Sequence, residues 1–60
     1  MTVIEVIKEY NLEDYPKHYK NPYGNYIDLK YPLDTLAKME VKDIYINLRT
    51  KEAEITIIDF

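Results

Sequence analysis

Apolar and polar side chains alternate along the last part of the chain, with the two-residue period of half-buried β-strands. The runs cover 42–48 and 53–59, and the chain would turn between them at Thr50-Lys51, or through a four-residue loop over 49–52 that gives the same register. On the apolar face this register pairs Leu48–Ala53, Ile46–Ile55 and Ile44–Ile57. A slip of one residue would turn the whole apolar set towards water. The sequence therefore predicts a C-terminal β-hairpin.

The first residues carry a helical pattern of apolar side chains. These recur every three to four positions, at Val3, Val6, Ile7 and Tyr10. Thr2 and Glu5 have the spacing of a capping box, in which each side chain accepts a hydrogen bond from a backbone N–H of the first turn. Because four residues between positions 3 and 7 are β-branched, a strand is the alternative. The pattern favours a short amphipathic helix over 2–10.

The middle of the chain carries turn-forming residues, followed by a short alternating run. Proline, glycine and asparagine concentrate in 11–25, which predicts an irregular loop with a β-turn at 21–24. Alternation then predicts a strand over 26–31, which Pro32 ends because proline has no backbone N–H to donate. One or two helical turns are expected over 33–39.

A chain of 60 residues holds one small core. The patterns predict a single domain over 1–60 of the α+β class, with a short N-terminal helix packed on a small antiparallel sheet of about three strands that ends in the hairpin. Domains of this size bury only about 60% of the surface that the unfolded chain exposes, so disulfides, metals, association or very good packing must help. Because cysteine is absent, a homodimer is one expectation.

The composition excludes several kinds of chemistry. The chain has no cysteine and no serine, one glycine and one histidine. These counts exclude disulfides, thiolate zinc sites, a serine nucleophile and a glycine-rich phosphate loop. His18 alone cannot build a metal site, and the paired carboxylates are typical of solvated faces. We therefore expect a protein that is not an enzyme, with no catalytic residue, no metal and no cofactor.

The formal net charge of −3 favours solubility and disfavours binding to nucleic acid or to an anionic membrane. No apolar run approaches the roughly 20 residues that cross a bilayer. Charged residues also interrupt the apolar residues near the N-terminus, unlike the core of a signal peptide. The sequence therefore predicts a cytoplasmic protein with no membrane partner.

Tyrosine and lysine concentrate between positions 15 and 31. Five of the seven tyrosines lie in this range, where three lysines accompany one aspartate in an otherwise acidic chain. The candidate interaction residues are Tyr15, Lys17, His18, Tyr19, Lys20, Tyr23 and Tyr26. Tyrosines are enriched where proteins bind proteins, and beside lysine they also stack on the bases of single strands. A third interpretation is that they form a satellite core under the long loop.

Elimination and this tyrosine-rich segment together give the functional hypothesis. We expect a small non-enzymatic protein-interaction module, a regulator, inhibitor or accessory protein of the kind that bacteria and phages encode as short genes. It would contact a protein partner through the tyrosine loop or an exposed sheet edge. The alternative is a weak single-stranded nucleic-acid binder that uses Lys17, Lys20 and Lys30 with the same tyrosines. The net charge counts against that alternative.

Overall fold

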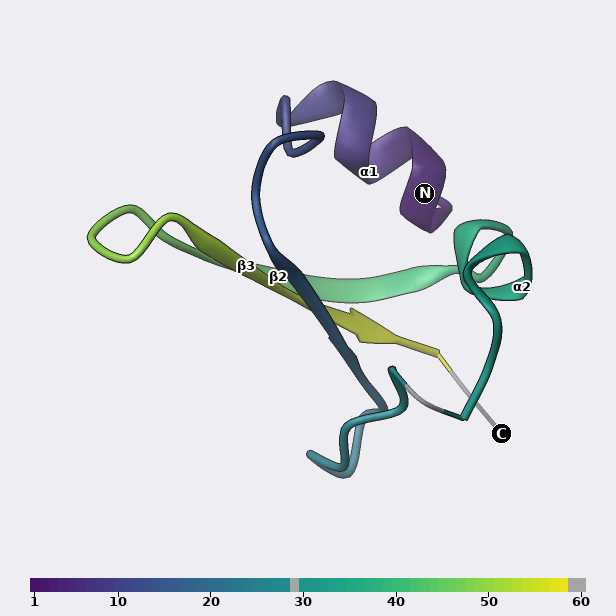
Figure 1. Cartoon of the computed structure of the whole chain (residues 1–60). Coiled ribbons are helices and arrows are strands. Elements are labelled where there is room, and N and C mark those ends of the chain that lie inside the picture. Colours follow the sequence, from purple (N-terminus) through teal and green to yellow (C-terminus); the bar gives the residue numbers. More distant parts are fainter. Residues whose placement is uncertain (29, 59–60) are drawn as a thin grey trace.

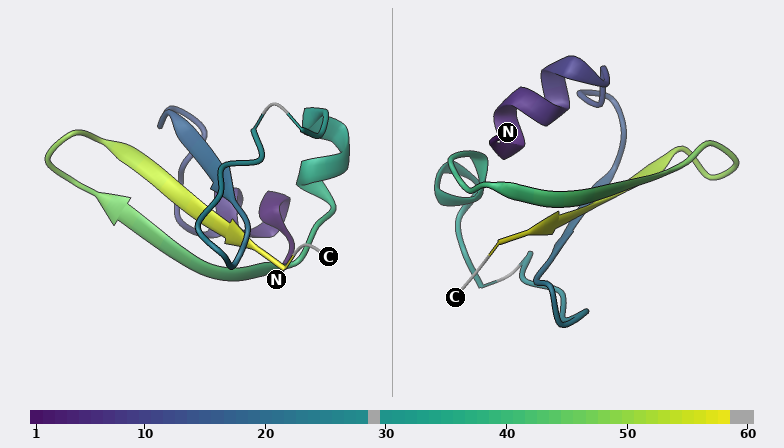
Figure 2. Two further views of the ribbon diagram at one scale, coloured as in Figure 1. Left: turned by 90° about the horizontal axis from the view of Figure 1, so that it is seen from below. Right: turned by 180° about the vertical axis from the view of Figure 1, so that it is seen from behind.

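The computed structural model describes residues 1–28 and 30–58, which form two short helices and a three-stranded sheet (Figure 1). In chain order the elements are α1 (Val3–Glu9), β1 (Lys17–Lys20), α2 (Leu33–Ala37), β2 (Val41–Asn47) and β3 (Glu52–Ile57). α1 lies across one face of the sheet, as the view from behind also shows (Figure 2). The predicted α+β fold, with an N-terminal helix and a C-terminal hairpin, is confirmed. Neither of the described helices is long and apolar enough to cross a membrane.

The sheet is mixed rather than antiparallel. Its strand order is β1-β3-β2, so β3 occupies the centre although it comes last in the sequence. β2 and β3 form the predicted hairpin, while β1 runs parallel to β3. A parallel pair needs a long connection, and the chain between β1 and β3, which includes α2 and β2, provides it. The prediction of a purely antiparallel sheet is therefore wrong, because β1 is parallel to its neighbour.

The hairpin keeps the predicted faces but shifts its register by two residues. Ile46 pairs with Ala53 and Ile44 with Ile55, whereas the sequence pattern predicted Ile46 opposite Ile55. A shift of two residues leaves every side chain on its own face, because successive side chains of a strand alternate. The apolar face therefore points into the core as predicted, although its pairs differ. Position 59 of the predicted second strand lies outside the described residues.

The turn of the hairpin explains this register. It occupies residues 48–51, and the side-chain oxygen of Asn47 accepts two backbone N–H groups of the turn at 3.0 and 3.2 Å. Lys51 closes the turn with a φ of 57°, in the left-handed region. Leu48 consequently lies in the turn and is 75% exposed, instead of packing on the apolar face as predicted.

α1 begins with the predicted capping box. The Glu5 backbone N–H donates to the Thr2 hydroxyl at 3.4 Å, and the Thr2 backbone N–H donates to the Glu5 carboxylate at 2.8 Å. The hydrogen bonds from the Thr2 backbone and hydroxyl hold the pKa of Glu5 below its usual range. Val3 and Val6 point from the helix into the core. The helix predicted over 2–10 is thus confirmed.

The prediction of a strand over 26–31 is wrong, and β1 lies instead inside the predicted loop. Tyr26 forms an isolated bridge to β1, and position 29 of the segment lies outside the described residues. The Ile27 N–H donates to the Tyr19 carbonyl at 2.8 Å, but the Ile27 carbonyl accepts an N–H within a turn. The Asp28 carboxylate takes the Tyr19 N–H instead, at 2.6 Å. The backbone pairing therefore ends after two bonds, the one from Ile27 to Tyr19 and the one from the Asn21 N–H to the Asn25 carbonyl at 2.9 Å.

The core lies between the sheet and the two helices. Its buried side chains come from both helices, from β1 and β3, and from the loops: Val3, Val6, Leu12, Tyr19, Ile27, Leu36, Ala53, Ile55 and Ile57. The helical turn predicted over 33–39 is confirmed as α2, which contributes Leu36. The three core residues of β3 are 0% exposed because this strand is central and faces α1. The alternate residues of β3 point to the opposite side of the sheet.

Candidate functional site

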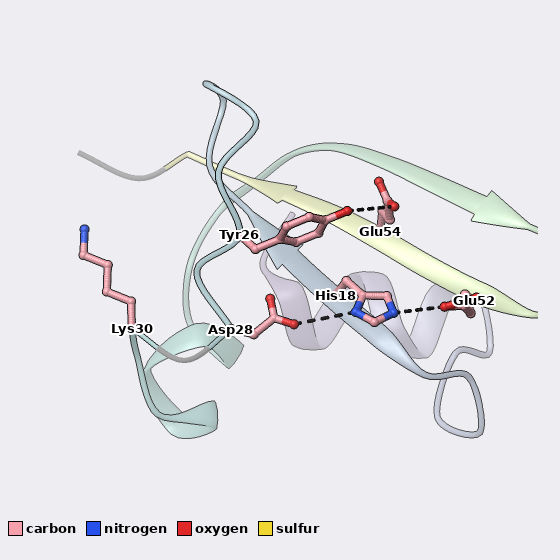
Figure 3. Close-up of a pocket in the computed structure, with 6 residues that line it drawn as sticks. All are labelled: His18, Tyr26, Asp28, Lys30, Glu52 and Glu54. Atoms are coloured by element: carbon pink, nitrogen blue, oxygen red, sulfur yellow. Dashed lines mark hydrogen bonds and ion pairs between the residues drawn. The ribbon is translucent and has the colours of Figure 1, made fainter.

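The face of the sheet opposite α1, called here the outer face, carries polar and aromatic side chains. It is formed by alternate residues of the three strands: His18 and Lys20 of β1, Asp43, Tyr45 and Asn47 of β2, and Glu52, Glu54 and Thr56 of β3. No helix in the described part of the chain packs on this face, and Figure 3 shows it with α1 behind the sheet. The alternation that fills the core thus also builds a polar surface.

Residues 26–28 extend the outer face beyond the edge of β1. Ile27 is hydrogen-bonded to β1 and points inward, where it is 2% exposed. Because side chains alternate along an extended segment, Tyr26 and Asp28 point onto the outer face (Figure 3). The Tyr26 side chain reaches over β1, and its hydroxyl donates to Glu54 Oε2 on β3 at 3.3 Å. This short segment therefore brings an aromatic ring and a carboxylate to the sheet surface.

A depression of about 850 Å³ lies on this part of the outer face. Its lining residues are His18, Tyr26, Asp28, Lys30, Glu52 and Glu54 (Figure 3). Three of them are carboxylates and one is a lysine, so the lining has a formal charge of −2 when the imidazole is neutral. The Lys30 ammonium lies 5.3 Å from the centre of the Tyr31 ring and points away from the carboxylates.

His18 lies between two of these carboxylates. Its Nε2 is 3.1 Å from Glu52 Oε2, and its Nδ1 is 3.7 Å from Asp28 Oδ2. The Nε2 contact with Glu52 is short enough for a hydrogen bond, whereas the Nδ1 contact with Asp28 is longer than one. The Tyr26 ring meets the imidazole edge to face, with 6.3 Å between ring centres and 74° between ring planes. His18 thus joins β1, β3 and the segment after β1 at one point.

Glu54 occupies the middle of the outer face. Its Oε1 is 3.1 Å from the Lys20 ammonium, and its Oε2 accepts the Tyr26 hydroxyl. These hydrogen bonds, above all the one from Lys20, hold the pKa of Glu54 below its usual range. On its other side Glu54 pairs with Tyr45 of β2. Tyr26 and Tyr45 are 61% and 62% exposed, so a carboxylate lies between two accessible tyrosines.

Three of the residues predicted from the tyrosine-rich segment meet on the outer face. His18 and Lys20 are alternate residues of β1, and Tyr26 lies beside them across the strand. The single buried residue of β1, Tyr19, points the other way, and this alternation separates the candidates into two groups. The sequence hypothesis of an accessible aromatic and basic surface therefore describes only part of the segment.

The other four predicted residues lie elsewhere. Tyr19 is 6% exposed, and burial raises the pKa of its hydroxyl. The Lys17 ammonium donates to the carbonyls of Leu12 and Tyr15, both at 2.8 Å, and so holds the loop before β1. Tyr15 packs half-buried against the core, while Tyr23 is 85% exposed in the predicted β-turn. The satellite-core interpretation thus describes Tyr15 and Tyr19.

The three carboxylates of the site are not among the candidate residues that the sequence predicts. Glu52 and Glu54 alternate with the apolar residues of the predicted hairpin, and this pattern is typical of a solvated face. Asp28 lay on the polar side of the predicted strand over 26–31. Nothing in the local pattern brings these residues to His18. The parallel pairing of β1 with β3 brings Glu52 and Glu54 there, and the contacts of residues 26–28 with β1 bring Asp28.

The site offers hydrogen-bonding, ionic and aromatic groups. Within residues 1–28 and 30–58, no three histidine, aspartate or glutamate side chains are placed to hold a metal ion. No family model, no curated protein and no solved structure matches the chain. The outer face itself, with an acidic depression, an imidazole at its centre and tyrosines beside it, is therefore the feature that bears on function.

Proposed function

We propose that the protein is a small non-enzymatic interaction module that binds a protein partner with the outer face of its sheet. The observation that carries this proposal is the exposure of Tyr26 and Tyr45 on a sheet face that no described helix covers. Tyrosine offers a large contact area with few rotatable bonds, and its hydroxyl tolerates water in the free state. A partner would bury both rings together with the polar groups between them.

The remaining groups of the outer face favour recognition over chemistry. Each carboxylate of the depression already has a partner within the protein: Asp28 holds the Tyr19 N–H, Glu52 holds His18, and Glu54 holds Lys20. The chain has no serine or cysteine to act as a nucleophile. A fixed pattern of charges and rings suits specific binding, because little freedom is lost when a partner arrives.

The charges of this surface count against the nucleic-acid alternative. The Lys17 ammonium is bound to backbone carbonyls, and the Lys20 ammonium is paired with Glu54. The depression beside them is lined by more acids than bases. Phosphate groups would meet net negative charge there, so we favour a protein partner. A regulator, inhibitor or accessory protein fits this description.

Selection from a random peptide display library tests the proposal. We expect peptides that bind the wild-type chain and lose about tenfold or more in affinity for the Tyr26→Ala and Tyr45→Ala variants. Tyr10→Ala is the matched control, because Tyr10 is 49% exposed at the end of α1 and lies away from the outer face. Failure to select any peptide, or equal losses in all three variants, would contradict the proposal. Sedimentation equilibrium separately tests the predicted homodimer.

A further inference from the structure

We propose that the outer face binds an arginine side chain of its protein partner, which enters the depression between Tyr26 and the carboxylates. This inference rests on the proposed function and adds the chemistry of the partner. The partner would therefore bind through a basic segment. A partner that binds through neutral or acidic residues would contradict it.

Charge complementarity is the first argument. Asp28, Glu52 and Glu54 bring three carboxylates to one depression from two separate segments of the chain. Lys30 is the one lysine among the lining residues, and its ammonium lies by the Tyr31 ring, away from the carboxylates (Figure 3). Glu54 is already paired with the Lys20 ammonium, so a cation that enters the depression meets the negative charge of Asp28 and Glu52.

The free acceptor positions provide the second argument. Asp28 uses Oδ1 for the Tyr19 N–H, and Glu52 uses Oε2 for His18. In the described part of the chain, Glu52 Oε1 accepts no hydrogen bond, and Asp28 Oδ2 has only its 3.7 Å contact with His18 Nδ1. A guanidinium group presents five N–H donors in a rigid plane, so it can serve two carboxylates at once, which suits arginine better than lysine.

The Tyr26 ring provides the third argument. It lines the depression, is 61% exposed, and is held at both ends, by the backbone bridge to β1 and by the hydroxyl bond to Glu54. Guanidinium groups stack on aromatic faces, and the attraction adds to that of nearby carboxylates. Because the ring is already fixed, a ligand does not have to order it.

An NMR titration of the full ¹⁵N-labelled chain tests the inference. The ligand is N-acetyl-arginine amide, and N-acetyl-citrulline amide is an uncharged control of nearly the same shape. We expect saturable shifts of the His18, Tyr26 and Glu52 amides with arginine, and affinity lower by about tenfold or more with citrulline. Glu52→Gln keeps an acceptor for His18 but removes a charge, and should weaken arginine binding about fivefold or more. Glu9→Gln on α1 is the matched control and should change nothing.

Equal shifts with citrulline, shifts centred on another surface, or an unchanged affinity in Glu52→Gln would overturn the arginine assignment. The display selection separates this failure from failure of the proposed function. Peptides that require Tyr26 and Tyr45 but lack arginine would contradict the arginine assignment alone. Absence of any such peptide would contradict both proposals. Circular dichroism checks that each variant is folded, and Asp28→Asn replaces Glu52→Gln if the latter unfolds.

Discussion

Replacing Asp28 with alanine removes the contact that ends the backbone pairing beside β1. The Asp28 carboxylate accepts the N–H of Tyr19 at 2.6 Å, and Tyr19 is a core residue. A hydrogen bond to a charged group contributes about 1.5–3 kcal/mol, and a buried donor without a partner costs about 1–3 kcal/mol. The Asp28 side chain is 32% exposed, so water can reach part of the space that alanine leaves. We therefore expect Asp28→Ala to lower the free energy of unfolding by about 2 kcal/mol.

Two variants make this prediction specific. Asp28→Asn keeps an acceptor oxygen and should cost about 1 kcal/mol, because only the charge is lost. Asp14→Ala is the control, since Asp14 is an exposed aspartate of the loop before β1 and should cost less than about 0.5 kcal/mol. A domain of this length has roughly 3–9 kcal/mol of stability in total, so these differences are well resolved by urea unfolding.

Hydrogen exchange identifies the cause of the loss. The Tyr19 amide should exchange faster in Asp28→Ala than in Asp28→Asn, while amides of the β2–β3 hairpin change only as much as global stability does. A Tyr19 amide that stays as protected as in the wild type would refute the reasoning, as would an Asp28→Ala variant no less stable than Asp14→Ala. In either case another contact would have to end the pairing beside β1.

Three further predictions concern stability. Ile55→Ala should lower the free energy of unfolding by about 2–5 kcal/mol, because Ile55 is fully buried at the centre of the sheet. A loss below about 1 kcal/mol, measured by urea unfolding, would contradict this prediction. Since the pKa of Glu54 lies below its usual value of 4.5, its contribution to the free energy of unfolding is present above pH 4.5 and is lost as the pH falls further. Glu54→Gln should therefore make stability, followed by circular dichroism, decline less steeply in acid. Since the pKa of Tyr19 lies above its usual value of 10.0, its contribution to the free energy of unfolding is present below pH 10 and is lost as the pH rises further. Tyr19→Phe should therefore reduce the loss of stability in alkali, measured by the same method.

Local chemistry made α1 and the hairpin predictable. The capping box at Thr2 and Glu5 needs only four consecutive residues, and the alternation of β2 and β3 fixes which face is buried. The exact register was missed because a shift of two residues leaves the alternation unchanged. Asn47 and Lys51 set that register through the geometry of the turn, which apolar patterning does not encode.

β1 and the site escaped prediction for a different reason. β1 has four residues and a single buried side chain, Tyr19, so its sequence shows no apolar alternation. Its strand character comes from pairing with β3 far along the chain. The contact of His18 with Glu52 depends on that pairing, and the position of Asp28 depends on one hydrogen bond to β1. Such contacts between distant segments follow from tertiary structure and cannot be found by scanning neighbouring positions.

The central position of β3 has a consequence for how the chain acquires its structure during synthesis. Among the three described strands, β1 and β2 each pair with β3 and not with each other, and β3 is the last of them to leave the ribosome. β1 is therefore translated well before β3, and until β3 is made the backbone groups of β1 that pair with it have no strand partner. The hairpin can close within its own few residues, whereas β1 must bridge a long separation in sequence to join it. We expect the nascent chain to stay without a sheet until residues 52–57 emerge, and then to fold in one late step.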